Sequence, residues 1–248
     1  MQTIYQQILS ASEQRGAGYF VLVDPDKISN SELSDFAHRA TESGVDALLV
    51  GGSLVTDDSF HSCIHTLKQH TNIPVIIFPG SVQQISKEAD AILFLSLLSG
   101  RNPEHLIGNQ VIAAPIIKKY NLEAISTAYM LVESCSTTSA EFMSNTKPLP
   151  RNKVDIAVAH ALAAEYLGFK MIYLEAGSGA QYSVPEEMIS AVAKYCSVPL
   201  IVGGGIVSPD EAHKKVGAGA RFIVTGNVFE KDGNASLMKE FARAIHKT

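Results

Sequence analysis

The chain has 248 residues, of which 46% are hydrophobic and 18% are charged, and its formal net charge at pH 7 is −5. This length and composition suit one folded unit with a large apolar core, so we expect residues 1–248 to form a single domain. The small negative charge, without any run of basic residues, argues against nucleic acid as a partner.

Cysteine usage and hydropathy indicate a compartment. Cys63, Cys135 and Cys196 lack metal-binding spacing, and their odd number argues against a disulfide framework. The N-terminal segment has no apolar signal core, and no apolar run approaches the roughly 18–20 residues that span a bilayer. We therefore expect a cytoplasmic protein with at most peripheral membrane contact.

Short apolar runs alternate with helical patterns along the whole chain. The runs with the length and β-branched content of buried strands lie at residues 19–23, 46–50, 74–78, 91–95, 124–133, 171–174, 199–206 and 221–227. The helical patterns lie at residues 3–14, 33–40, 60–67, 103–120, 154–167, 185–195, 209–216 and 237–245. We expect the first helix to close the bottom of a barrel and Ser31 to cap the second.

Eight strand signals in alternation with helices predict an α/β fold, a (β/α)₈ or TIM barrel, with an open doubly wound sheet as its competitor. Only about a dozen residues separate the third and fourth strands, so the third helix should be shortened or missing. Residues 134–152 form the longest polar stretch, and a structureless loop of that length is usually functional or disordered.

Glycines follow the last strands of the predicted barrel. Residues 203–206 and 225–227 would form the loops after strands seven and eight, where such barrels commonly bind phosphate. Glycine leaves backbone N–H groups accessible to an anion, because it has no Cβ. These loops therefore predict a phosphate cup.

Glu175 directly follows a buried apolar run, where a carboxylate is costly unless it is paired or has a chemical task. A structural ion pair is the alternative to a catalytic role, and Tyr173 could equally be a core aromatic. Asp24 and Lys27 lie in a turn after the first strand, and shaping that turn is the alternative to a role in binding; the alternative for Ser53 is a helix cap.

If these strand ends share one mouth, Asp24 with Mg²⁺ would suit a diphosphate, because magnesium is typically held by one or two carboxylates plus substrate phosphates. The phosphate cup would hold a second, smaller phosphate. The residues thus suggest a transfer between a phosphorylated acceptor and a diphosphate donor.

Five motifs spread over nearly the whole chain carry a family resemblance. They are VDPDK at 23–27, GGS at 51–53, YLEAGSG at 173–179, VGGGI at 202–206 and TGN at 225–227. Together they resemble the geranylgeranylglyceryl phosphate synthase family, which includes bacterial heptaprenylglyceryl phosphate synthases of the PcrB type. Residues 147–168 resemble the branch with archaeal and Bacteroidetes members.

The resemblance implies a Mg²⁺-dependent prenyltransferase that joins the 3-hydroxyl of sn-glycerol 1-phosphate to geranylgeranyl diphosphate and releases pyrophosphate. It implies that Asp24 and Ser53 bind the metal and that Glu175, Tyr173 and Lys27 are catalytic. The substrate-binding residues that it implies are Tyr173, Leu174, Glu175, Ala176, Gly177, Ser178, Gly179, Gly203, Gly204, Thr225, Gly226 and Asn227. Family members form dimers or hexamers, so a homo-oligomer is expected.

An apolar groove near residues 93–98 and the helix after Pro103 would hold the polyprenyl tail, whose length the sequence does not fix. A phosphosugar isomerase or lyase on the same barrel is the rival enzyme class. Such enzymes need a catalytic aspartate pair or a barrel lysine, and no lysine falls in the predicted strands five to seven. A non-catalytic phosphate sensor would leave Glu175 and Asp24 without a task.

Overall fold

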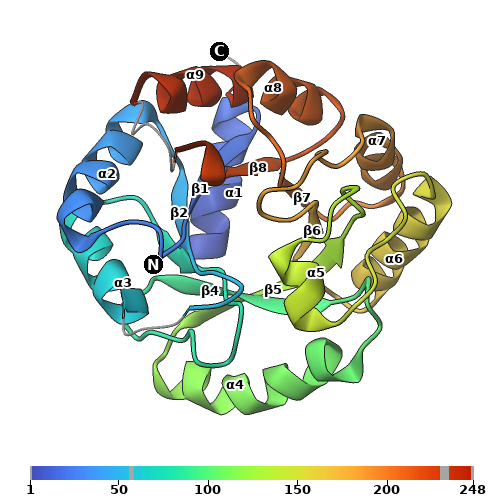
Figure 1. Cartoon of the computed structure of the whole chain (residues 1–248), viewed down its shortest axis with the longest axis horizontal. Helices are drawn as coiled ribbons and strands as arrows, with labels where there is room; N and C mark the ends of the chain where they lie inside the picture. Colours follow the sequence, from blue (N-terminus) through green and yellow to red (C-terminus); the bar gives the residue numbers. More distant parts are fainter. Residues whose placement is uncertain (1, 56–58, 230–234, 247–248) are drawn as a thin grey trace.

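Eight parallel strands close into a barrel in the computed structural model of the chain, which describes residues 2–55, 59–229 and 235–246 (Figure 1). Each strand pairs with the next along the chain, and β8 pairs with β1, so the predicted (β/α)₈ barrel is confirmed and the open sheet is excluded. The strands are β1 (Gly18–Val23), β2 (Ala47–Val50), β3 (Val75–Ile77), β4 (Ala91–Leu97), β5 (Glu123–Leu131), β6 (Met171–Glu175), β7 (Leu200–Gly203) and β8 (Phe222–Thr225).

Helices surround the strands as an outer ring, and α1 crosses behind the ring's centre in Figure 1. The helical elements are α1 (Ile4–Arg15), α2 (Asn30–Ser43), α3 (Ser59–His70), the π-helix η1 (Glu104–Gly108), α4 (Asn109–Lys119), α5 (Ser139–Ser144), α6 (Val154–Tyr166), α7 (Glu186–Tyr195), α8 (Pro209–Gly217), the 3₁₀ helix η2 (Asn227–Phe229) and α9 (Ala235–Ile245).

Strand side chains alternate between two apolar layers. Phe20 and Tyr173 belong to the layer inside the barrel, whereas Tyr19 and Leu174 belong to the layer between strands and helices. Because both faces are buried, the strands read as continuous apolar runs in the sequence. The alternation nevertheless decides which side chain of each strand can approach the centre of the barrel.

Helix α1 closes the N-terminal end of the barrel, as predicted. Its Ile8 packs into the interior layer, and the carboxylate of Glu123, the first residue of β5, accepts hydrogen bonds from the N–H groups of Ile4 at 2.6 Å and Tyr5 at 3.1 Å. A carboxylate at a helix N-terminus stabilises the unpaired N–H groups there. This contact fixes α1 to the strands that it covers.

The connection between β3 and β4 contains no helix, which confirms the prediction of a shortened or missing third helix. Residues 78–90, all of them described, form bends and turns. The next helical segment begins with η1, a π-helix that the sequence pattern did not distinguish from the α-helix after it. One stretch of the barrel wall is therefore covered by bends and turns in place of a helix.

One sequence prediction was wrong in detail. Ser29, not Ser31, is the N-cap of α2, and the Glu32 side chain accepts the N–H of Ser29 at 3.2 Å. The polar stretch 134–152, whose conformation the sequence left open, contains α5, capped by Thr138, and its Leu149 pairs with Val132. The short polar helix α5 lacks the apolar periodicity from which a longer helix is recognised.

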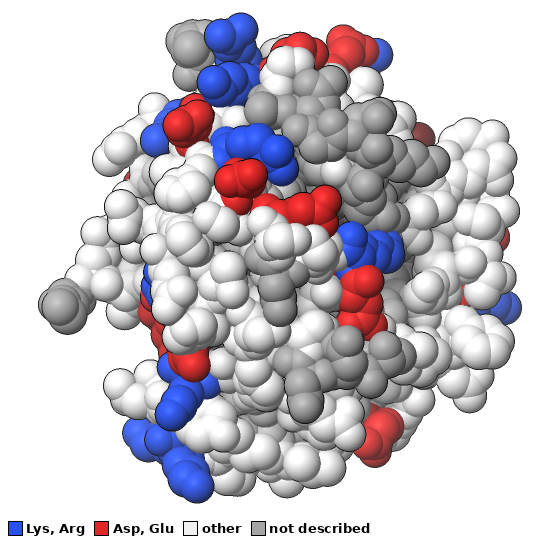
Figure 2. Space-filling view, turned by 60° about the vertical axis from the view of Figure 1, so that its left-hand side comes forward, with Lys and Arg blue, Asp and Glu red and all other residues white. Residues whose placement is uncertain are grey.

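On the face shown in Figure 2, lysine and arginine side chains lie among aspartate and glutamate side chains. That face is not the uniformly basic surface that nucleic acids require. Separately, none of the helices in the described ranges combines the length and apolar character of a membrane span.

Replacing Asp46 with alanine should destabilise the fold without lowering activity. This carboxylate precedes β2 at the N-terminal end of the barrel and accepts hydrogen bonds from Arg15 at 2.7 Å, the Tyr19 N–H at 2.8 Å and His246 at 2.9 Å. Loss of these bonds to a buried charge should lower the free energy of unfolding by roughly 1–3 kcal/mol. Urea denaturation would measure the change in the free energy of unfolding. A loss of kcat in the folded variant would contradict the expectation that the active site lies at the other end of the barrel, at the carboxyl ends of the strands.

Candidate active site

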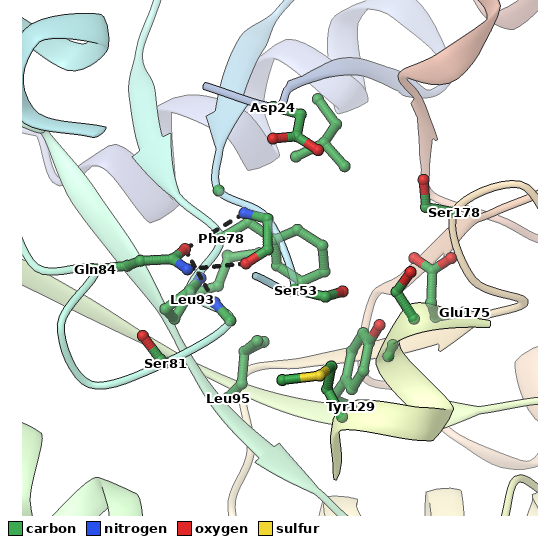
Figure 3. Close-up of a pocket in the computed structure, with 18 of the residues that line it drawn as sticks. Asp24, Ser53, Phe78, Ser81, Gln84, Leu93, Leu95, Tyr129, Glu175 and Ser178 are labelled. Carbon is green, nitrogen blue, oxygen red and sulfur yellow. Dashed lines mark hydrogen bonds between the residues drawn. The ribbon is translucent and has the colours of Figure 1, made fainter. Parts of the chain in front are cut away.

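A cavity of about 740 Å³ opens at the carboxyl ends of the barrel strands. Its walls come from the loops after β1, β2, β3, β6, β7 and β8, together with parts of β4, α4 and α5. Asp24 and Gly204 both line it, although one lies near the start of the chain and the other near its end. The side chains of Asp24, Ser53 and Glu175 surround one open space (Figure 3).

Glu175 is the last residue of β6, and only 5% of it is exposed. Its Oε1 accepts a hydrogen bond from the N–H of Gly177 at 2.6 Å. Burial raises the pKa of Glu175, while the neighbouring Tyr173 hydroxyl and the Gly177 N–H oppose the shift. A carboxylate with a raised pKa and a fixed orientation has the properties of a general base.

Tyr173 lies inside the barrel within an aromatic cluster. Its ring stacks on Phe78 with centroids 5.4 Å apart and meets Tyr129 edge-on, also at 5.4 Å. Its buried hydroxyl lies beside the Glu175 carboxylate but makes no hydrogen bond of ordinary geometry with the described residues. Because an unpaired buried hydroxyl is costly, this atom is a candidate contact for a polar substrate group.

The loop after β7 approaches the end of β6 as closely as glycine permits. At Gly204, φ is +81°, and an added Cβ would collide with Glu175 Oε1. At Gly203, an added Cβ would collide with the Tyr173 hydroxyl. These contacts place the backbone of the predicted phosphate cup beside the two side chains that would contact the acceptor.

The structure places the predicted substrate-binding residues in three kinds of position. Those that line the cavity are Tyr173, Glu175, Ser178, Gly179, Gly204, Thr225 and Gly226. Leu174 and Ala176 instead lie in the outer apolar layer, because side chains alternate along β6. Gly177 and Gly203 support the wall through their contacts with Glu175 and Tyr173.

The Thr225 side chain is placed differently from a simple phosphate contact. The Thr225 hydroxyl hydrogen-bonds to the Tyr19 hydroxyl at 2.9 Å, although the residue lines the cavity. Asn227 begins η2, and its side chain lies outside the described part of the chain. Backbone groups of this loop therefore remain the natural anion ligands.

Asp24 directly follows β1 on another side of the cavity. Lys27 Nζ lies 3.6 Å from Asp24 Oδ2, and the N–H of Asp26 donates to Asp24 Oδ1 at 3.2 Å. The loop after β2 is close, because a Cβ added to Gly52 would lie 3.1 Å from Asp24 Oδ1. Ser53 is the next residue and lines the same cavity.

These donors suit a magnesium ion that is shared with a substrate. Mg²⁺ is typically bound by one or two carboxylates, with phosphates and waters as its other ligands. No group of three or more His, Cys, Asp or Glu residues is placed to hold a metal within the described ranges. Asp24 with the Ser53 hydroxyl, beside a glycine that leaves room at the carboxylate, fits the shared arrangement.

An apolar arm of the cavity runs along β4 and α4. Its lining includes Leu93, Leu95, Leu97, Ala113 and Ile117. It lies where the sequence predicted the groove for the tail. Residues that the sequence analysis missed also line the cavity, namely Phe78, Gln84, His105, Tyr129 and Met143.

Together, the fold and the site define a (β/α)₈ barrel in which one cavity joins the glycine loops after β7 and β8, the Asp24 turn and an apolar lining from β4 and α4. Residues 10–245 match the PcrB family, and the chain belongs to that family. The family resemblance predicted from the motifs is thereby confirmed.

Several relatives are similar over nearly their full length. The chain is 50% identical to the geranylgeranylglyceryl phosphate synthase of Flavobacterium johnsoniae, over 94% of this chain and 96% of that protein. It is 44% identical to the enzyme of the same name from Chitinophaga pinensis, over 98% and 96%. A crystal structure of (S)-3-O-geranylgeranylglyceryl phosphate synthase from Thermoplasma acidophilum, in complex with its substrate sn-glycerol-1-phosphate, superposes with a TM-score of 0.94 at 35% identity, over 100% of both chains.

Proposed function

We propose that the chain transfers the polyprenyl group of geranylgeranyl diphosphate to the 3-hydroxyl of sn-glycerol 1-phosphate, forming an ether and releasing pyrophosphate. One observation carries the proposal: a single cavity joins the glycine loops and Glu175, the Asp24 turn, and an apolar arm. The enzyme names of the relatives, and the substrate bound in the Thermoplasma acidophilum structure, support the same reaction.

The acceptor would bind at the C-terminal end of β6. Backbone N–H groups after β7 and β8, at Gly204 and Gly226, would hold its phosphate. The hydroxyl of Tyr173 and the carboxylate of Glu175 would then contact the glycerol, with Ser178 at the cavity margin. This arrangement would fix the 3-hydroxyl beside the base before the donor reacts.

Glu175 would take the proton of the 3-hydroxyl while the oxygen of that hydroxyl forms a bond to C1 of the polyprenyl chain. The bond from C1 to the diphosphate oxygen breaks, and its electron pair leaves with pyrophosphate. General-base catalysis of this kind typically contributes about 10²–10⁴-fold. Lys27, 3.6 Å from Asp24, would face the growing negative charge on the leaving group.

Asp24 and Ser53 are the residues that would hold Mg²⁺. When bound, the ion supplies positive charge that stabilises the departing diphosphate. Leu93, Leu95 and Ile117 would cover the tail. Removing about 15 or more of its carbons from water favours binding by roughly 0.8 kcal/mol each, less the cost of ordering them.

A phosphosugar isomerase or lyase is less well supported. The described strands β5, β6 and β7 carry no lysine, and an apolar arm has no task in such a reaction. The likeness to the tryptophan synthase alpha chain from Legionella pneumophila, with a TM-score of 0.62 at 14% identity over 99% of this chain and 98% of that one, concerns the fold alone. A single-domain chain, a cytoplasmic location and homo-oligomeric assembly stay predictions.

Partition of a radioactive acceptor tests the reaction directly. The protein would be incubated with Mg²⁺, geranylgeranyl diphosphate and labelled sn-glycerol 1-phosphate, and the mixture extracted with organic solvent. Transfer moves the label into the organic phase, and omission of geranylgeranyl diphosphate is the control. Label that stays in water in the complete mixture would contradict the proposal.

A further inference from the structure

Gln84 lies in the chain that takes the place of a helix between β3 and β4, and it is 4% exposed. A buried glutamine must find partners for both ends of its amide, or its burial is costly. Its partners are backbone groups of Gly52, in the loop after β2, and of Gly80, in the same β3–β4 connection as Gln84 itself.

A single side chain joins the loops after β2 and β3 (Figure 3). Gln84 Nε2 donates to the Gly52 carbonyl at 2.8 Å, and its Oε1 accepts from the N–H groups of Gly52 at 3.3 Å and Gly80 at 3.1 Å. The two loops also touch, since a Cβ added to Gly80 would collide with the Gly52 carbonyl. The Gln84 amide thus holds both the N–H and the carbonyl of Gly52 in a fixed position.

The Gly52 peptide lies between Gln84 and the candidate metal ligands. Its Cα is close to Asp24, since an added Cβ would stand 3.1 Å from Oδ1, and Ser53 follows it directly. A shift of the Gly52 peptide would therefore move the Ser53 hydroxyl relative to the Asp24 carboxylate. Binding of the ion and the diphosphate is sensitive to such shifts. Mutation of a residue that orients a metal ligand typically lowers the affinity for the metal by about 10–100-fold.

We infer that Gln84 is a positioning residue for the diphosphate site, holding Gly52 and Ser53 so that Ser53 and Asp24 face the same ligand. The inference rests on the proposed function. None of the three hydrogen bonds reaches the loops after β6, β7 or β8. Loss of the Gln84 amide should therefore weaken one ligand and leave the other, which a general loss of packing would not do.

Calorimetric binding of two separate ligands tests this. The first titrant is inorganic pyrophosphate with Mg²⁺, and the second is sn-glycerol 1-phosphate. Gln84→Met removes the amide at similar volume. Gln84→Glu keeps the acceptor for both N–H groups but turns an oxygen toward the Gly52 carbonyl, so it remains a test if the methionine variant does not fold. Gln69→Met, at an exposed position on α3, is the matched control.

We expect Gln84→Met and Gln84→Glu to weaken Mg²⁺-pyrophosphate binding by about 10–100-fold. Binding of sn-glycerol 1-phosphate should stay within about twofold, and Gln69→Met should match the wild type in both titrations. A folded Gln84 variant that binds both ligands as the wild type does, or loses both equally, would overturn the inference. Failure of the wild type to transfer label would instead contradict the proposed function.

Discussion

Replacing Glu175 with glutamine should lower kcat by about 10²–10⁴-fold, the contribution typical of a general base. Glutamine keeps the size of the side chain and an oxygen that can accept the N–H of Gly177, now 2.6 Å from Oε1. It cannot take a proton from the acceptor hydroxyl. Binding of sn-glycerol 1-phosphate should therefore change little, and single-turnover transfer would measure the chemical loss.

The control for this change is Glu187→Gln, an exposed position on α7. It should transfer the polyprenyl group at the wild-type rate. Full activity in Glu175→Gln would reject the role of Glu175 as the base. A large rise in the Kd of sn-glycerol 1-phosphate without loss of kcat would assign Glu175 to binding alone.

The pH profile supplies a second test of Glu175, because burial raises its pKa. The residue can accept a proton only when ionised, so kcat of the wild type should fall with decreasing pH at a higher pH than an exposed glutamate would give. The free energy of unfolding should change with pH in the opposite direction to kcat, rising as the pH decreases. A pKa raised in the folded state means that stability is lost as pH rises through that pKa. Thermal unfolding above it should therefore find Glu175→Gln at least as stable as the wild type.

Replacing Asp24 with asparagine should reduce kcat/KM for geranylgeranyl diphosphate by roughly 100-fold or more, since a catalytic metal is worth several kcal/mol. The change removes the carboxylate from the candidate Mg²⁺ site and leaves Lys27 without the negative oxygen that lies 3.6 Å from it. The Kd of sn-glycerol 1-phosphate should stay near the wild-type value. Higher Mg²⁺ should recover part of the lost rate.

Asp35→Asn, an exposed position on α2, is the matched control and should keep the wild-type dependence on Mg²⁺. Equal loss of affinity for both substrates in Asp24→Asn would point to damage of the barrel mouth as a whole. Unchanged dependence on Mg²⁺ in that variant would remove Asp24 from the metal site.

The strands and the order of the barrel were predictable because most strands are buried on both faces and read as apolar runs. Their ends were predictable too, since the glycines after β7 and the Asp24 turn interrupt those runs. The short connection before β4 followed from counting residues. In each case the signal is local, so neighbouring residues in the chain suffice to find it.

Features that depend on tertiary contact could not be predicted in this way. Tyr173 and Leu174 are equally apolar neighbours in an all-buried strand, and the barrel alone decides that only Tyr173 faces the cavity. Gly80 is a near neighbour of Gln84 in the chain, but Gly52 belongs to a loop that only the closed barrel brings beside it. The cap of α2 is different, since the spacing of Ser29 and Glu32 is a capping-box signature that was open to recognition.

The missing helix between β3 and β4 bears on the shape of molecule that the barrel can accept. A complete ring of helices suits compact, polar metabolites that sit wholly at the mouth. Here the cavity extends along β4 and α4, beside the stretch of wall that lacks a helix. An elongated amphiphile can thus keep its charged head among the loops while its hydrocarbon part lies sideways along the rim. The absence of one helix thus leaves room, beside the polar mouth of this barrel, for a long apolar chain.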